Sequence, residues 1–234
     1  MAQPTAIVTG GSRGIGLSIT ECFIDAGYAV VVGARTDAGL EKCLPDMVRF
    51  ASVDVSEESG HRELTQLASD WTGSVDVYIN NAGYSEWRPI EEIDEVFFDD
   101  LIGTNLKGAF WGCKAAIDAM PDGGSIINIS SIAGKRGSAN NTMYCASKFG
   151  MNGLTQALAK EIGQREIRVN AVCPVLVATD GLVEALNNPH APAQGDVEGF
   201  FSSFAKNNSA LGRLPTGNEV AAMCLFLASD AASA

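Results

Sequence analysis

Short apolar runs rich in β-branched residues alternate with longer amphipathic segments along the chain, and this alternation constrains the fold more than any other feature. Each run is bounded by turn residues, which is typical of a buried strand. The six runs are 6–8, 29–32, 48–53, 75–79, 125–129 and 167–172. Repeated strand–helix alternation predicts an α/β fold with a doubly wound parallel sheet covered by helices on both faces. Ligands of such sheets bind beyond the carboxyl ends of the strands.

The segments between these runs are predicted as helices, and none of them looks like a linker that would divide the chain. The predicted helices are 15–26, 38–44, 57–71, 93–120, 142–163 and 216–228. The last one begins with Thr216 and Glu219 at the spacing of a capping box. Residues 179–214 break the rhythm, because they are rich in Asn, Pro, Gly and Ser, which is typical of a lid or binding loop. We therefore expect a single domain, residues 1–234, with a lid at about 179–214.

The composition is that of a globular protein with an acidic balance. Of the 234 residues, 46% are hydrophobic and 19% are charged, and the net charge is −12. A basic surface for nucleic acid or for anionic lipid is therefore not expected. No apolar run approaches the ~20 residues of a membrane span, and the N-terminus does not resemble a signal peptide. Six scattered cysteines indicate reduced thiols in a cytoplasmic protein, and two histidines without ligand spacing indicate no metal site.

A glycine-rich turn joins the first predicted strand to the first predicted helix. The residues of this turn that would surround a pyrophosphate are Gly10, Ser12, Arg13, Gly14, Ile15 and Gly16. Glycines let the backbone turn tightly and approach a phosphate, and the free N–H groups at the start of the helix attract negative charge. The alternative is a tight turn without a ligand, but the position between a strand and a helix favours a nucleotide site.

The end of the second predicted strand indicates which nucleotide is bound. Sites for NAD carry an acidic residue about 20 residues after the glycines, where it binds the ribose 2′-hydroxyl. Residues 32–36 contain no acid, and Arg35 stands where a guanidinium can pair with a 2′-phosphate. Together with Arg13, this residue favours NADPH over NADH. The alternative is that both are ordinary surface arginines.

Tyr144 and Lys148 stand four residues apart at the start of a predicted helix and therefore share one face of it. A free tyrosine has a pKa of ~10, which is too high for acid–base work near neutral pH. A nearby ammonium favours the phenolate, so we expect Lys148 to lower the pKa of Tyr144. Ser130 and Ser131 close the fifth predicted strand, at the end where the chemistry is expected.

Six motifs in this order resemble the short-chain dehydrogenase/reductase family over the whole chain. They are the glycine turn from Thr9 to Gly16, Asp54-Val55, Asn80-Asn81-Ala82-Gly83, Asn105, Ser131, and Tyr144 with Lys148. The resemblance implies a Rossmann-like fold and an NADP(H)-dependent oxidoreductase that moves a hydride between the nicotinamide and a carbonyl or secondary alcohol. It selects Ser131 over Ser130, because the family serine lies thirteen residues before the tyrosine.

The resemblance also implies roles for the matching residues. Tyr144 would donate a proton to the carbonyl oxygen or remove one from the alcohol, and Ser131 would polarise that carbonyl. Lys148 would bind the nicotinamide ribose, and Asn105 would hold a water that links to Lys148 in a proton relay. The other implied cofactor contacts are Asp54 and Val55 at the adenine, Asn81, Ala82 and Gly83 at the adenosine ribose, and Pro174, Val177 and Thr179 after the sixth strand. The alternatives are that Asp54 only caps the turn after it and that residues 81–83 are only structural.

Two features depart from the family pattern. The family has Pro-Gly after the sixth strand, whereas Val175 follows Pro174 here, and valine disfavours positive φ. We expect this loop to take a modified path and the cofactor still to bind. The family also continues into a seventh strand and a glycine-bearing tail, whereas this chain has six predicted strands. Either the sequence lacks its natural end or the sheet has an open edge, and we favour the first explanation.

The substrate pocket is expected between residues 84–88, residues 132–139 and the lid. The side chains in these loops that would meet a substrate are Trp87, Arg88, Lys135 and Arg136. They favour a polar or anionic carbonyl substrate, and the alternative is that these charges are only solvated. By family analogy, the long helices 93–120 and 142–163 would form the interface of a homodimer or homotetramer.

Two other classes of protein fit parts of the sequence. A catalytically silent NADPH-binding sensor would need the glycine turn, but it would not need Ser131, Tyr144 and Lys148 together. A methyltransferase also tolerates a glycine turn and has no need of the tyrosine–lysine pair. The leading hypothesis is therefore an NADP(H)-dependent carbonyl reductase or alcohol dehydrogenase.

Overall fold

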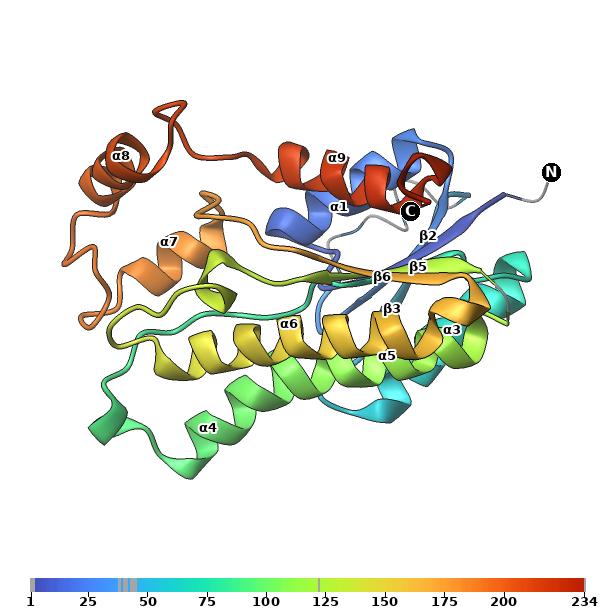
Figure 1. The fold of residues 1–234 in the computed structure, drawn as a ribbon, viewed down its shortest axis with the longest axis horizontal. Coiled ribbons are helices and arrows are strands. Elements are labelled where there is room, and N and C mark those ends of the chain that lie inside the picture. The colour runs from blue at the N-terminus through green and yellow to red at the C-terminus, as the bar shows by residue number, and fades with distance from the viewer. Residues whose placement is uncertain (1–2, 38, 40–41, 43–45, 122, 234) are drawn as a thin grey trace.

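A six-stranded parallel sheet forms the centre of the computed structural model, which describes residues 3–37, 39, 42, 46–121 and 123–233 (Figure 1). The strands follow in the spatial order β3-β2-β1-β4-β5-β6. Their bounds are β1 Thr5–Thr9, β2 Ala29–Ala34, β3 Val48–Ser52, β4 Val77–Asn80, β5 Gly124–Ile129 and β6 Ile167–Val172. All six predicted strands are present, with their ends shifted by at most two residues. The doubly wound α/β fold is confirmed.

Helices cover both faces of this sheet (Figure 1). α1 and α9 pack against each other on one face, and α3, α5 and α6 cover the other. Their bounds are α1 Gly14–Asp25, α3 Glu58–Thr72, α5 Gly108–Ala119, α6 Thr142–Ile162 and α9 Gly217–Ala228. Each face buries its own apolar cluster, one containing Phe23 and Val220 and the other containing Leu64 and Leu158. The helix predicted at 38–44 lies mainly outside the described residues.

Short helical turns complete the described structure. The 3-10 turns are η1 Ile90–Glu92, η3 Ile132–Gly134, η4 Gly163–Arg165 and η5 Asp230–Ala232. Of the helices in the described part of the chain, none combines the length and the apolar character that crossing a membrane requires.

The helix predicted at 93–120 exists, but its middle is not a regular α-helix. α4 (Glu95–Ile102) and α5 are joined by η2, a π-helical segment at Gly103–Lys107. π-Helical turns are rare and frequently occur at functional sites. This one contains Asn105, for which the family resemblance implies a place in the proton relay.

The lid contains two helices, so its prediction as a loop was wrong. They are α7 (Asp180–Leu186) and α8 (Val197–Asn208). Thr179 caps the first, because its side chain accepts a hydrogen bond from the N–H of Leu182. Asp196 caps the second in the same way. Such capping residues are a signal of helix starts in the sequence.

Trp87 anchors the lid to the rest of the chain. Its side chain is only 6% exposed and lies in a small apolar cluster with Leu186, Ala191 and Ala193. Phe200 and Phe201 of α8 pack against this cluster. The prediction that Trp87 lines an open substrate pocket is therefore wrong, because the indole is buried inside the lid.

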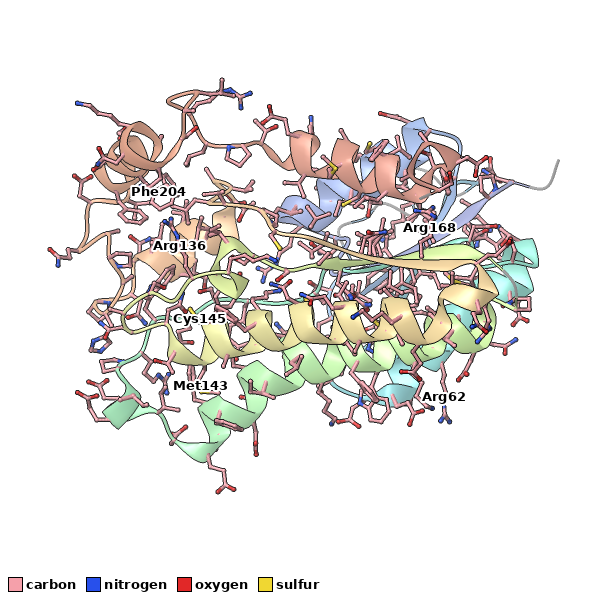
Figure 2. All side chains as sticks on the ribbon, in the orientation of Figure 1. Arg62, Arg136, Met143, Cys145, Arg168 and Phe204 are labelled. Carbon is pink, nitrogen blue, oxygen red and sulfur yellow. The ribbon has the colours of Figure 1, made fainter. Side chains whose placement is uncertain are left out.

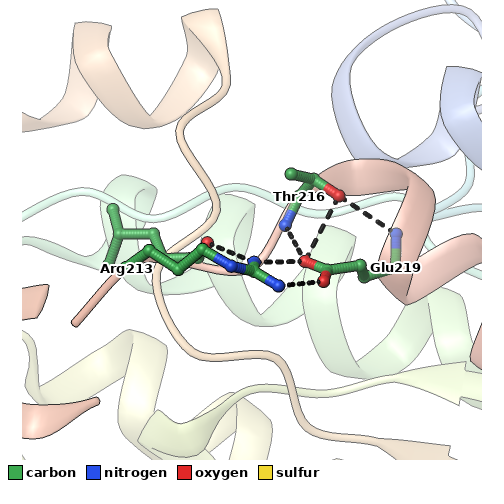
Figure 3. A network of polar contacts seen from close by, with 4 residues as sticks. Arg213, Thr216 and Glu219 are labelled. Carbon is green, nitrogen blue, oxygen red and sulfur yellow. Dashed lines mark hydrogen bonds and ion pairs between the residues drawn. The ribbon is translucent and has the colours of Figure 1, made fainter. Parts of the chain in front are cut away.

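α9 begins at the predicted capping box, which the structure confirms (Figure 3). The hydroxyl of Thr216 accepts from the N–H of Glu219 at 3.2 Å, and the Glu219 carboxylate accepts from the N–H of Thr216 at 2.8 Å. Arg213 donates two hydrogen bonds to the same carboxylate at 2.6 and 2.9 Å. These hydrogen bonds lower the pKa of Glu219 to about 2, and the bonds from Arg213 have the largest effect. They fix the chain between the lid and α9.

β6 forms an edge of the sheet in the described part of the chain, because it pairs with β5 alone. Arg168 of β6 donates hydrogen bonds to the carbonyl oxygens of Leu227 and Ala228 at the end of α9 (Figure 2). A guanidinium at a helix C-terminus satisfies carbonyl groups that have no partner within the helix. The edge strand is thus tied to α9.

Candidate active site

The carboxyl ends of β1 and β4 lie side by side, and the chain leaves them toward opposite halves of the sheet. After β1 it continues to β2 and β3, and after β4 it continues to β5 and β6. Parallel sheets bind ligands in the crevice at such a reversal of strand order. The glycine turn follows β1 and residues 81–83 follow β4, so the two segments meet at this crevice.

The glycine turn has a backbone that other residues would strain. Gly10 and Gly14 have φ angles of 65° and 55°, in the region that glycine adopts without steric cost. A Cβ on Gly16 would stand 2.1 Å from the carbonyl oxygen of Gly10, so glycine is needed for α1 to pack on the turn. α1 starts after Arg13 without a side-chain cap. Its first N–H groups can therefore bind an anion.

Hydrogen bonds fasten the segment after β4 to this turn. The hydroxyl of Thr9 accepts from the N–H groups of Asn81 at 3.0 Å and Ala82 at 3.1 Å. The side chain of Asn81 donates to the carbonyl oxygens of Thr9 at 2.9 Å and Gly10 at 3.2 Å. Asn81 and Ala82 therefore have a structural role here, and the same bonds place them beside the glycine turn.

Arg35 and Asp54 stand at the ends of the neighbouring strands β2 and β3, and both are exposed. Within the described part of the chain, the guanidinium groups of Arg13 and Arg35 have no hydrogen-bond or ion-pair partner, so both remain able to bind a phosphate. Hydrogen bonds from Ser56, one of them from its N–H at 2.9 Å, lower the pKa of Asp54. The charges of Arg35 and Lys107 add a smaller effect in the same direction. Asp54 therefore does cap the turn after it, and its ionised carboxylate can accept further hydrogen bonds.

Ser131, Tyr144 and Lys148 come together beyond the carboxyl end of β5. The Nζ of Lys148 lies 5.7 Å from the centroid of the Tyr144 ring, one turn earlier on α6. The Ser131 side chain lowers the pKa of Tyr144 and accepts from the N–H of Ala133 at 3.0 Å. Lys148 is buried and donates to the carbonyl oxygen of Ile129 at 2.8 Å. The three predicted catalytic side chains thus form one cluster.

Burial controls the ionisation of both residues of α6. It raises the pKa of Tyr144, and the hydrogen bond from Ser131 lowers this pKa by a smaller amount. Burial also lowers the pKa of Lys148 to about 8. The expectation of a lowered pKa for Tyr144 is therefore wrong for this structure, because burial of the phenol, which the sequence argument did not count, raises the pKa overall.

Asn105 is buried in the π-helical segment and holds the loop after β4. Its Oδ1 accepts from the N–H of Tyr84 at 3.0 Å, and its Nδ2 donates to the carbonyl oxygen of Tyr84 at 2.8 Å and to the hydroxyl of Ser147 at 3.3 Å. A Cβ on Gly83 would stand 2.9 Å from the Oδ1 of Asn105 and 3.6 Å from the Nζ of Lys148. The predicted residues Gly83, Asn105 and Lys148 therefore lie close together. The bonds to Tyr84 were not predicted, because a bond to the backbone leaves no pattern of residue types.

The loop after β6 reaches the site without strained backbone at Val175. In the described chain, the residues other than glycine with positive φ are Asn140, Glu166 and Gln194. Val175 is 37% exposed and is not among them. The loop thus follows a path that valine tolerates. The carbonyl oxygen of Pro174 accepts from the N–H of Ile132 at 2.9 Å, which ties this loop to the segment that carries Ser131.

The same loop touches the glycine turn. Val177 is buried in the apolar cluster between the sheet and α1. The methyl group of Thr179 lies 3.4 Å from the position of a Cβ on Gly14. The first residue of the lid therefore lies against the turn that begins α1, and the predicted cofactor residues after β6 border the same crevice.

The four charged or aromatic residues predicted at the substrate have different surroundings. Arg88 lies 2.7 Å from the carboxylate of Glu86 and 4.1 Å above the ring of Phe97, so its charge is already paired. Lys135 lines a groove of about 390 Å³ between α6 and β6, together with Asn152 and other residues. Arg136 is exposed at the end of the molecule that carries the lid helices (Figure 2).

Comparisons with known proteins agree with this geometry. A family model described as short chain dehydrogenase matches residues 4–189. The chain is 37% identical to the 3-oxoacyl-(acyl-carrier-protein) reductase FabG of Chlamydia trachomatis serovar D, over the whole chain and 93% of that protein. It is 32% identical to the NADP-dependent (R)-specific alcohol dehydrogenase of Lentilactobacillus kefiri, over 96% of the chain and 89% of that protein. A crystal structure of an actinorhodin polyketide ketoreductase variant with NADPH superposes with a TM-score of 0.90 at 31% identity, covering 100% of this chain and 94% of the other.

Proposed function

We propose that this chain, which belongs to the short chain dehydrogenase family and is an NADP(H)-dependent oxidoreductase, reduces the carbonyl group of a small molecule. The reaction would take place at the crevice between β1, β4 and β5. The observation that carries the proposal is the cluster of Ser131, Tyr144 and Lys148 beside the glycine turn. When bound, the nicotinamide supplies the hydride. The residues of the chain supply the proton, the orientation and the electrostatic environment.

Tyr144 is the proton donor in this proposal. Its phenol interacts with Ser131, and a carbonyl oxygen that enters the cluster would accept from both hydroxyl groups. These bonds strengthen as negative charge develops on that oxygen during reduction. Burial keeps Tyr144 protonated before the reaction, which suits its role as an acid. In the direction of oxidation, the same group would accept the proton of the alcohol.

Lys148 acts as a buried cation next to this tyrosine. Its ammonium group favours the phenolate that remains after the proton has left, because the low dielectric of the interior strengthens the attraction. Its position near Gly83 also allows it to bind hydroxyl groups of the nicotinamide ribose. Asn105 holds the loop that contains Tyr84 and thereby the wall of the site beside Lys148. A water linking Asn105 to Lys148 would complete a path for protons.

The cofactor would lie across the carboxyl ends of the strands. The glycine turn would hold the pyrophosphate, since α1 begins there without a side-chain cap and its first N–H groups can donate to an anion. Arg13 and Arg35 would pair with the 2′-phosphate. The other residues proposed to contact it are Ser12, Ile15, Asp54, Val55, Asn81, Ala82, Gly83, Pro174, Val177 and Thr179.

The test of the catalytic assignment replaces Tyr144 by phenylalanine. The Tyr144→Phe variant should bind NADPH with the affinity of the unchanged protein, measured by the fluorescence of NADPH, and should lose turnover by a factor of about 10² or more. Tyr28→Phe is the matched control, because Tyr28 packs on Phe23 at the other end of the sheet. A Tyr144→Phe variant with full activity would refute the assignment, and an unchanged protein that binds NADPH without any turnover would support a sensor instead.

The substrate class is tested by following NADPH oxidation with several kinds of carbonyl compound. The names of the relatives place 3-oxoacyl thioesters first in this screen, followed by keto acids, oxo-sugars, aldehydes and cyclic ketones. Arg136 favours substrates with a polar or anionic group. Replacing Arg136 by alanine should raise KM for such a substrate and leave KM for a neutral ketone unchanged.

The proposed unit of function is the single domain of residues 1–234, working as a homodimer or homotetramer. Three phenylalanines of α4, α5 and α6 are almost half exposed although they are large and apolar; they are Phe98, Phe110 and Phe149. Exposed apolar groups of this size are typical of protein–protein contacts. Light scattering coupled to gel filtration measures the mass, and a monomer at micromolar concentration would contradict this part of the proposal.

A further inference from the structure

A histidine and a tyrosine form a buried hydrogen-bonded pair behind the proposed adenine site. His61 lies on α3 with 1% of its surface exposed, and Tyr78 lies on β4 with none exposed. The Nδ1 of His61 is 2.8 Å from the phenol oxygen of Tyr78, and the Nε2 is 2.8 Å from the carbonyl oxygen of Val55. None of the proposed catalytic steps uses this pair.

The chemistry of the three groups determines which atom donates in each bond. A carbonyl oxygen can only accept, so the Nε2 of His61 carries a proton and donates to Val55. Burial lowers the pKa of His61, so the ring is neutral and its Nδ1 has no proton. Nδ1 therefore accepts from the hydroxyl of Tyr78. The bonds run in one direction, from Tyr78 through His61 to the backbone of Val55.

The bond to Val55 also orients Asp54. The carbonyl group of Val55 and the N–H group of Ser56 belong to one planar peptide unit, so holding the first fixes the direction of the second. That N–H donates to the Oδ1 of Asp54 at 2.9 Å. The hydrogen bonds from Ser56 are the largest cause of the lowered pKa of Asp54. Two hydrogen bonds thus connect the buried His61 to the exposed Asp54 carboxylate through one peptide unit.

Close packing leaves this loop little room to adjust by other means. A Cβ on Gly60 would stand 2.8 Å from the carbonyl oxygen of Asp54, and a Cβ on Gly108 would stand 2.8 Å from that of Val55. The backbones of α3 and α5 therefore contact the loop from both sides. Between these contacts, His61 supplies the hydrogen bond that sets the direction of the Val55–Ser56 peptide.

We propose that His61 is a positioning residue for the cofactor: through the Val55–Ser56 peptide it orients the Asp54 carboxylate so that this group accepts a hydrogen bond from the amino group of adenine. The inference rests on the proposed function, which places Asp54 at the adenine. A carboxylate can only accept, and the 6-amino group is the donor that the adenine base offers at its edge. His61 thereby contributes to the choice of base without touching the cofactor.

The experiment compares NADPH with its hypoxanthine analogue, which has a carbonyl oxygen in place of the 6-amino group. The dissociation constants of both are measured by fluorescence titration. The unchanged protein should prefer NADPH by about 10-fold or more, the magnitude of a hydrogen bond to a charged group. In His61→Leu this preference should fall to within about 3-fold, with the change in KM for NADPH and not in kcat.

Two matched variants separate positioning from general damage to the core. Tyr78→Phe removes the outer hydrogen bond of the buried pair but leaves the bond to Val55, so it should keep the preference for NADPH. His61→Gln offers an amide N–H to Val55 and should restore most of the preference. If His61→Leu does not fold, the double variant His61→Leu/Tyr78→Phe replaces it, because no phenol is then left without a partner.

Asp54→Ala distinguishes failure of the inference from failure of the proposed function. A lost preference in both Asp54→Ala and His61→Leu, with Tyr78→Phe unchanged, supports the inference. If Asp54→Ala loses the preference for NADPH but His61→Leu keeps it, the inference is overturned and the proposed adenine site remains intact. An unchanged preference in Asp54→Ala removes Asp54 from the adenine site and overturns both.

Discussion

Replacing Lys148 by methionine should stabilise the protein in the absence of cofactor, although it should abolish turnover. Burial lowers the pKa of Lys148 from its usual value of 10.5 to about 8. This difference in pKa between the unfolded and folded states corresponds to about 3 kcal/mol at pH 7. The hydrogen bond to the carbonyl oxygen of Ile129 is lost in the variant, which costs about 1–3 kcal/mol. The expected net gain is up to about 2 kcal/mol, or up to about 8 °C in Tm for a chain of this length.

The effect should change sign as the pH rises. The folded protein binds the proton of Lys148 less tightly than the unfolded chain does, so its stability increases with pH between about 8 and 10.5. This increase amounts to about 2 kcal/mol from pH 7 to pH 9.5, and Lys148→Met lacks it. The variant should therefore be more stable than the unchanged protein at pH 7 and no more stable at pH 9.5. Urea unfolding and calorimetry at the two pH values, at one protein concentration, measure this difference.

Lys160→Met is the matched control, because Lys160 lies on the same helix and is exposed. It should shift the free energy of unfolding by less than about 0.5 kcal/mol at either pH. The reasoning fails if Lys148→Met is less stable than the unchanged protein at pH 7, or if the difference between the two proteins does not depend on pH. Either result would mean that the buried ammonium is better solvated than its surroundings indicate.

Three further changes test other parts of the site. Arg35→Ala should weaken NADPH binding by about 10-fold or more and leave NADH binding unchanged, because a charged hydrogen bond to the 2′-phosphate is lost; fluorescence titration measures both. Val175→Gly should leave NADPH affinity within a few-fold, and a large gain would show that valine distorts the loop. Trp87→Ala should loosen the lid by about 3–5 kcal/mol, the cost of removing a buried aromatic side chain. Limited proteolysis should then cut the lid at protease concentrations and temperatures at which the unchanged protein resists cleavage.

Most of the fold follows from local patterns in the sequence. The six strands could be predicted because each is a short apolar run between turn residues, and burial on both faces makes such runs stand out. The lid helices were missed although Thr179 and Asp196 are good N-caps, because the segment around them is rich in helix-breaking residues. The π-helical segment around Asn105 could not be predicted at all, since no residue type marks it.

The composition of the site was easier to predict than its ionisation. The spacing of Tyr144 and Lys148 puts both on one face of a helix, and the family resemblance adds Ser131 at the end of a strand, so the three could be placed together before the structure was known. Their pKa values depend on how much water reaches them, which is a property of the whole fold. Tyr144 illustrates the difference, because the sequence predicted a lowered pKa whereas burial raises it. Trp87 is a second example, since its burial depends on a lid that the sequence did not reveal.

The buried pair of His61 and Tyr78 shows why a site extends beyond the residues that sequence motifs identify. Neither residue stands at the end of a strand, and both are buried, so a motif search has no reason to select them. Their influence depends on one peptide unit whose two ends face opposite ways, toward His61 and toward Asp54. A buried side chain that donates a hydrogen bond to a backbone carbonyl group orients the peptide unit to which that group belongs. A buried side chain that only packs against other side chains does not. By this argument, hydrogen bonds from buried side chains to the backbone of ligand loops are the contacts to examine for positioning residues.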